Sequence, residues 1–245
     1  MPRNRAAVSQ KNRLQPWRTE RFCIAEKDRA RFVAQMEEVL DVYQAKHDDK
    51  HPLICMDEAA KQVQSDEVVP LPMTPGCPRR EDHHYERQGV QAVFCFIDPI
   101  RGWRRVTARD HRTRMDWAEE VRHLLDVEYP DAEYVTLICD NLNTHHKASL
   151  YAAFDAGTAG RLAKRLRLVH TPRNGSWLNI AEMELSVLTR QCIGRRFESV
   201  AAMKQAMMEW EKKRNEAGAG ANWQFTTVDA RIKLRGLYPK PDMIQ

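Results

Sequence analysis

The sequence lacks several features that mark common classes of protein. No C-x-x-C pair occurs, which argues against a structural zinc site. No G-x-G-x-x-G or G-K-S/T motif follows an expected strand, which argues against a nucleotide-cofactor enzyme. No apolar segment approaches the length needed to span a bilayer, and the N-terminal residues lack the apolar core of a signal peptide, so we expect a cytoplasmic protein. The six cysteines, three of them inside apolar runs, are expected to be reduced core thiols.

The sequence also has little net charge. Its 39 lysines and arginines nearly balance 34 acidic residues, and the formal charge of +5 favours a polyanionic partner only weakly. The charge is more informative locally, because residues 1–21 contain six basic residues and a single acidic one, Glu20. Such a segment suits either a solvated tail or an arm that lies along phosphates. We therefore treat residues 1–27 as a basic N-terminal arm.

The spacing of the apolar residues predicts an α/β fold. Helical spacing indicates helices at 28–47, 114–132, 147–166, 180–192 and 199–218, the third interrupted by Gly157 and Gly160. Short apolar runs indicate strands at 51–63, 134–139 and 166–172, and 91–108 is typical of a β-hairpin. Residues 64–88 are rich in proline, glycine and charge and predict no regular element. This order predicts a mixed sheet with helices on both faces.

We expect one principal domain with extensions. Residues 28–50 should form a linker helix that packs against the main domain, which occupies residues 51–198. Residues 199–245 follow as a C-terminal helix and tail. The apolar side of this helix is expected to be core or a dimer face, which leaves a homodimer open: Met203, Met207, Met208 and Trp210.

Acidic residues stand where two of the expected strands end, Asp57–Glu58 after one and Asp140 after the other. Ligands of open α/β sheets bind at that edge, although an aspartate there can also simply form a turn. Carboxylates gathered without basic partners repel one another, and a hard divalent cation such as magnesium relieves the repulsion. Two such ions about 4 Å apart would clamp the attacking and leaving oxygens of a phosphoryl displacement.

The late helix supplies two further candidate carboxylates, Glu182 and Glu184. They stand about 200° apart around a helix, so only one can face Asp140, and the spacing does not say which. Asn179 and Glu182 also have the spacing of a capping box, with Asn179 as N-cap. By spacing alone, capping is the favoured role for Glu182.

Three blocks of sequence resemble the signature blocks of the bacterial insertion-sequence transposases of the mariner superfamily, the DDE endonucleases. The blocks are D-E after the first strand, D-N-L-N-T-H after the next, and H-T-P-R-N-G-S-W-L-N-I-A-E at the start of the late helix. The closing segment N-W-Q-F-T-T-x-D-A-R-x-K-L extends the resemblance, which covers roughly residues 15–239.

The resemblance implies a ribonuclease H-like fold and a triad of catalytic, metal-binding carboxylates at Asp57, Asp140 and Glu182. It implies two Mg²⁺ or Mn²⁺ ions as cofactors. The implied reaction is hydrolysis at the ends of an insertion sequence, followed by strand transfer to target DNA, usually at a TA dinucleotide. A protein with these DNA partners would be associated with the nucleoid.

Six other residues of the same blocks are candidates for holding the carboxylates or touching DNA, because ligating carboxylates are usually held by hydrogen bonds. They are Glu58, Asn141, Asn143, His145, Trp177 and Asn179. A simple turn is the alternative role for Asn141. Packing under the site is the alternative for Trp177.

The N-terminal part departs from the resemblance. The family carries a helix-turn-helix region that reads the terminal inverted repeats, and only residues 10–18 match its last stretch. We therefore expect a catalytic part whose helix-turn-helix half is missing or separately encoded. Two other functions stay open: a metal-dependent DNA nuclease that never joins strands, and a catalytically silent DNA-binding remnant of a transposase.

Overall fold

The computed structural model describes residues 28–239, so the basic arm expected at residues 1–27 lies outside the described residues. Five strands form one sheet in the order β3-β2-β1-β4-β5. β2 runs antiparallel to β1 and β3, whereas β4 runs parallel to β1 and β5. The mixed sheet expected from the sequence is therefore confirmed. The strands are β1 (Leu53–Asp66), β2 (Tyr85–Asp98), β3 (Trp103–Arg109), β4 (Val135–Cys139) and β5 (Leu166–His170).

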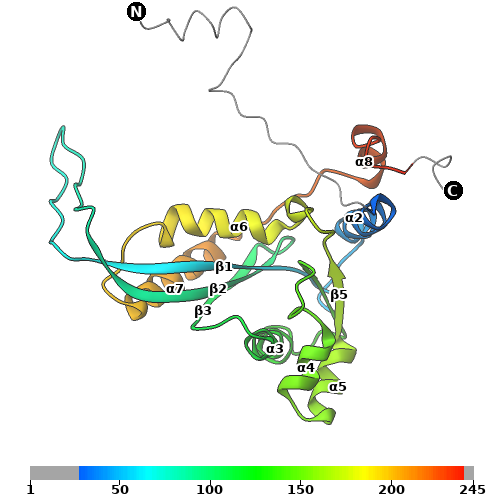
Figure 1. The fold of residues 1–245 in the computed structure, drawn as a ribbon. Coiled ribbons are helices and arrows are strands. Elements are labelled where there is room, and N and C mark those ends of the chain that lie inside the picture. The colour runs from blue at the N-terminus through cyan, green and yellow to red at the C-terminus, as the bar shows by residue number, and fades with distance from the viewer. Residues whose placement is uncertain (1–27, 240–245) are drawn as a thin grey trace, which may run out of the picture.

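Helices cover both faces of the sheet. The α-helices are α2 (Arg29–Gln44), α3 (Arg114–His123), α4 (Lys147–Ala153), α5 (Ala156–Arg165), α6 (Ile180–Leu188), α7 (Val200–Ala217) and α8 (Thr227–Lys233). A 3-10 turn, Ser176–Leu178, precedes α6, and π-helical turns extend α3 and α6 over Leu124–Glu128 and Thr189–Ile193. Figure 1 shows α3, α4 and α5 on one side of the sheet and α6 on the other.

The alternation of side chains along the strands divides the core between these two sides. Met56, Phe94 and Leu137 point toward α3, α4 and α5 and belong to one buried cluster. Cys55 and Ile138 point the other way, into a cluster formed with α2 and the start of α6. α7 closes a third cluster over β2 and β3. The linker helix expected to pack against the main domain does so, because its Phe32, Met36 and Leu40 are fully buried.

β1 runs past Asp57 to Asp66, so the expectation that this strand ends at Asp57–Glu58 was wrong. Its parallel pairing with β4 stops at Cys55, but antiparallel pairing with β2 continues to Asp66. The reason is that β2 is long enough to satisfy the backbone of β1 after β4 has ended. The hairpin tip beyond β1 contains only isolated bridges and exposes Val69 and Met73.

A smaller expectation about the helices was also wrong. The break in the segment 147–166 falls before Gly157, and both glycines lie inside α5. Asp155 decides its position, because its carboxylate caps α5 by accepting the amides of Gly157 and Thr158. On α7, Met203, Met207 and Trp210 are buried, as expected for core residues, whereas Met208 is 63% exposed, so it is not core and the alternative of a dimer face stays open for it.

Candidate active site

The sheet register brings Asp57 and Asp140 to neighbouring positions. β1 and β4 pair in parallel at Cys55 and Ile138. Asp57 follows Cys55 by two residues, and Asp140 follows Ile138 by two residues. Side chains two residues apart on a strand share a face, and adjacent strands are separated by about 4.8 Å. Asp57 therefore points to the α6 side of the sheet at the place where β1 and β4 separate, and Asp140 emerges beside it.

Asn179 fixes the start of α6 against β1. Its side-chain oxygen accepts the amide of Ala181 at 3.1 Å, and its amide nitrogen donates to the Met56 carbonyl at 2.9 Å. Asn179 is 2% exposed, so both contacts are shielded from water. The N-cap expected at Asn179 is thus confirmed, and the bond to Met56 ties the first turn of α6 to the residue that precedes Asp57.

The position of Glu182 distinguishes between its two candidate roles, which are capping α6 and facing Asp140. α6 has no capping box, and within the described residues the Glu182 carboxylate makes no hydrogen bond or ion pair. Glu182 instead lines a pocket of about 300 Å³ together with Asp57 and Asp140. Glu58, Thr171, Ser176 and Asn179 also line this pocket, which we call the acidic pocket.

Electrostatic repulsion is evident at Asp57. Burial raises the pKa of the Asp57 carboxyl to about 6, and the negative charges of Asp140 and Glu182 contribute to the rise. The hydrogen bond that Asp57 accepts from the Glu58 amide, at 2.8 Å, opposes it. The carboxylates are therefore close enough to interact. Oxygen ligands of this kind fit a hard divalent cation, which would offset their charges.

His145 links two carboxylates beneath the acidic pocket. Its Nδ1 lies 2.5 Å from Asp140 Oδ1, and its Nε2 lies 2.8 Å from Glu58 Oε1. The imidazole is fully buried and stacks on Trp117 with ring centroids 5.7 Å apart. Burial lowers the pKa of His145, but the hydrogen bonds, first of all to Asp140, outweigh it and raise the pKa to about 11. A charged His145 donates to both carboxylates and orients Asp140.

Replacing Asp57 by asparagine is expected to stabilise the metal-free protein near neutral pH. An acid whose folded pKa lies above its unfolded pKa of 3.8 contributes stability at low pH and loses it as pH rises through about 6. Asparagine cannot ionise, so the free energy of unfolding in EDTA should rise by about 2 kcal/mol at about pH 7 and hardly change at about pH 4. Urea unfolding of both proteins at the two pH values measures the difference.

The control for this measurement is Asp131→Asn, which removes an exposed carboxylate at the opposite end of β4. For this variant, the free energy of unfolding should differ between the two pH values by as much as it does for the wild type. If Asp57→Asn raised the free energy of unfolding equally at both pH values, the burial and repulsion of the Asp57 charge would not be the cause of the gain.

The remaining sequence candidates are placed as follows. Glu184 turns away from the acidic pocket and is buried against Arg104 and Arg214. Asn143 is exposed. Trp177 is 38% exposed and meets the edge of Phe225 with ring centroids 6.1 Å apart. Asn141 lines a second pocket, described below.

Sequence reasoning missed Thr171 and Ser176, which line the acidic pocket. Both belong to the block that begins at His170, and Thr171 directly follows β5. A polar residue at that end of a third parallel strand is the signal that could have identified Thr171. Ser176 carried no comparable signal.

The strand order and the helices on both faces define a ribonuclease H-like fold. Residues 52–204 match the family model described as "DDE superfamily endonuclease". The chain belongs to this family, and it is therefore classed with endonucleases. No curated protein sequence matches the chain.

Solved structures of a mariner transposase share the fold. The Mos1 mariner paired-end complex with Mn matches with a TM-score of 0.59 and 14% identity, covering 96% of this chain and 72% of that chain. The Mos1 strand transfer complex gives 0.55 and 15% identity, covering 87% and 65%. The isolated Mos1 catalytic domain gives 0.51 and 13% identity, covering 82% and 96%. Within the described part of this chain, no helix is long and apolar enough to cross a membrane.

Proposed function

We propose that this protein is the catalytic domain of a transposase that cuts DNA phosphodiesters and joins the resulting ends to a target. The observation that carries the proposal is the acidic pocket, in which Asp57, Asp140 and Glu182 come together on a ribonuclease H-like sheet. Membership of the DDE endonuclease family and the shared fold with the Mos1 complexes support it. Residues 51–198 are the proposed catalytic domain.

The proposed cofactors are two Mg²⁺ or Mn²⁺ ions held by Asp57, Asp140 and Glu182. The fit rests on the donor set, because the three side chains offer hard oxygen ligands and Glu182 has no other partner among the described residues. Bound ions supply Lewis acidity toward the phosphodiester and an attacking water of lowered pKa. His145 keeps Asp140 turned toward the pocket, and the Asn179 bond to Met56 keeps Glu182 opposite Asp57.

The proposed reaction has two displacements at phosphorus. In the first, water forms a bond to phosphorus and the bond to the 3′ oxygen breaks, which leaves a 5′-phosphate and a 3′-hydroxyl. In the second, this 3′-hydroxyl attacks a target phosphodiester and displaces another 3′ oxygen, so no external energy source is needed. The proposed partners are transposon ends and target DNA, the latter at TA sites, and a separately encoded helix-turn-helix half. A homodimer and an association with the nucleoid are also proposed.

A strand-transfer assay tests the proposal. The full chain, Mn²⁺ and a labelled DNA duplex with a free 3′-hydroxyl are incubated with supercoiled plasmid at low salt, where non-specific phosphate contacts suffice for binding. We expect nicked plasmid and covalent joining of the label to plasmid, both abolished by EDTA. Nicking without joining would favour the nuclease that never joins strands. DNA binding without nicking, with Mn²⁺ present, would favour the silent remnant.

A further inference from the structure

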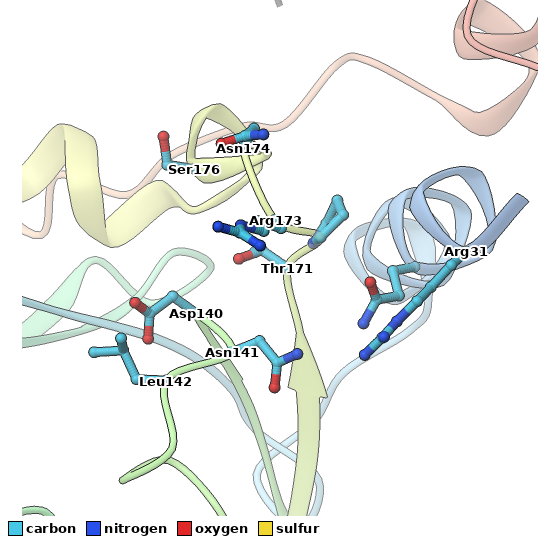
Figure 2. Close-up of a pocket in the computed structure, with 10 residues that line it drawn as sticks. Arg31, Asp140, Asn141, Leu142, Thr171, Arg173, Asn174 and Ser176 are labelled. Atoms are coloured by element: carbon cyan, nitrogen blue, oxygen red, sulfur yellow. The ribbon is translucent and has the colours of Figure 1, made fainter. Parts of the chain in front are cut away.

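A second pocket adjoins the acidic pocket on the side of α2. It encloses about 510 Å³ and shares Asp140, Thr171 and Ser176 with the acidic pocket. Arg31 and Gln35 of α2 form one wall, and the loop after β5 forms the other. Figure 2 shows Arg31 extending from α2 and Arg173 lying above Asp140, on opposite sides of the carboxyl end of β5. We call this space the basic groove.

The charge of the basic groove is opposite to that of the acidic pocket. Arg31 and Arg173 line it, and Asp140, at the junction, is the only acidic residue among the described residues that line it. Within residues 28–239, neither guanidinium forms an ion pair or a side-chain hydrogen bond. By contrast, Arg104, Arg165 and Arg214 are engaged by carboxylates or carbonyls. Two arginines beside an acidic site that have no partner within residues 28–239 are available to an anionic ligand.

The backbone presents Arg173 in a defined way. The amide of Gly175 donates to the Pro172 carbonyl at 2.8 Å, which closes a turn around Arg173 and Asn174. Asn174 has φ of 62°, a left-handed conformation that asparagine tolerates better than most residues. A Cβ on Gly175 would lie 2.9 Å from the Pro172 carbonyl oxygen, so glycine is required for this turn. The turn thus holds Arg173 over the groove by local sequence.

We propose that the basic groove binds backbone phosphates of the DNA strand that leads away from the phosphodiester held in the acidic pocket. Arg31 and Arg173 each contact one phosphate. This inference rests on the proposed function and adds the path of the substrate strand. Each phosphate carries a negative charge that the carboxylates of the acidic pocket repel, so a strand that passes Asp140 needs cationic contacts next to it. The junction at Asp140 makes one continuous channel of the two pockets.

The salt dependence of DNA binding tests this inference. Full-length wild-type protein, Arg31→Gln, Arg173→Gln and the double variant are titrated onto a short fluorescein-labelled DNA duplex, with Ca²⁺ as the cation, over a range of salt concentrations. Each arginine that contacts a phosphate should contribute about 0.9 to the slope of log affinity against log salt. We expect each single variant to lose about that slope and to bind about tenfold more weakly at low salt, and the double variant to lose about twice the slope.

Two further variants serve as controls for this measurement. Lys213→Gln removes an exposed charge of α7 that forms no ion pair with any described residue, and α7 packs on β3 at the opposite edge of the sheet from β5. It should bind as the wild type does. Arg173→Lys keeps the charge and should retain the salt slope. These outcomes would support phosphate contacts at the two arginines.

The inference and the proposed function can fail separately. If both glutamine variants keep the wild-type slope and affinity while the wild type nicks plasmid with Mn²⁺, the groove does not hold phosphates and the proposed function stands. If Lys213→Gln loses as much DNA affinity and salt slope as Arg31→Gln and Arg173→Gln do, the losses reflect net charge alone and the inference is overturned. If the wild type neither binds nor nicks DNA, both are overturned.

Discussion

Nicking of supercoiled plasmid in Mn²⁺ is expected to fall at least about a thousandfold when Asp140 is replaced by asparagine. The reason is that bound metal ions stabilise the transition state by several kcal/mol, and each loss of about 1.36 kcal/mol lowers the rate tenfold. Asparagine keeps the shape of the side chain and still offers an oxygen to His145 Nδ1. It removes the charge that would hold a cation between Asp140 and Asp57. The initial rate of nicking under conditions in which wild-type protein nicks measures the loss.

Asp131→Asn is the matched control for this experiment. Asp131 and Asp140 lie before and after β4, and Asp131 is exposed and remote from the acidic pocket. The control should nick at the wild-type rate, and circular dichroism should show both variants folded. A folded Asp140→Asn protein that nicks as fast as the control would rule out Asp140 as a metal ligand. Asp57→Asn and Glu182→Gln should behave as Asp140→Asn does.

Replacing Glu184 by glutamine is expected to lower the free energy of unfolding by about 3 to 5 kcal/mol, the usual cost of breaking a buried ion pair. The Glu184 side chain is 8% exposed and lies 2.9 Å from the Arg104 guanidinium and 3.0 Å from that of Arg214. Arg104 is fully buried, so glutamine would leave its charge without a carboxylate. Urea unfolding followed by circular dichroism measures the loss.

Glu182→Gln serves as the control for stability, because it makes the same chemical change two residues away at an exposed position. It should unfold as the wild type does in EDTA, or slightly later, since a repelling charge has been removed. Equal stability of Glu184→Gln and Glu182→Gln would show that the Arg104 pair does not stabilise the attachment of α6. The two glutamates of one helix thus have separable roles, one in the pocket and one in the core.

Much of the fold was predictable because its signals are local. The apolar run at 134–139 indicates a strand buried on both faces, and every residue of β4 is buried. The run at 166–172 also forms a strand, but β5 lies at the edge of the sheet and exposes Arg167. The hairpin expected at 91–108 has a locally stabilised turn, because the carboxylate of Asp98 accepts the amides of Ile100 and Arg101. The end of β1 was not predictable, because it depends on how far β2 pairs with it, which is a contact between distant residues.

The candidate site was predictable in part. Helical spacing reduced the choice to Glu182 or Glu184, and only the resemblance to the DDE endonucleases pointed to Glu182. The structure adds the reason why Glu184 turns away, which is the buried arginine on β3. His145 was a candidate from its sequence block, but its bridge to Glu58 joins residues 87 apart along the chain. No local pattern contains that contact.

By itself, the sequence determined the order of the main strands and helices, the cap at Asn179 and the set of acidic residues available to a metal, because these depend on neighbours along the chain. Tertiary structure decided which of those residues meet. The parallel register of β1 and β4 aligned Asp57 with Asp140, and the docking of α6 brought Glu182 to them. α2 and the turn after β5 placed Arg31 and Arg173 on one groove. These meetings depend on packing between segments far apart in the chain, where the hydrophobic core fixes distances that residue spacing does not encode.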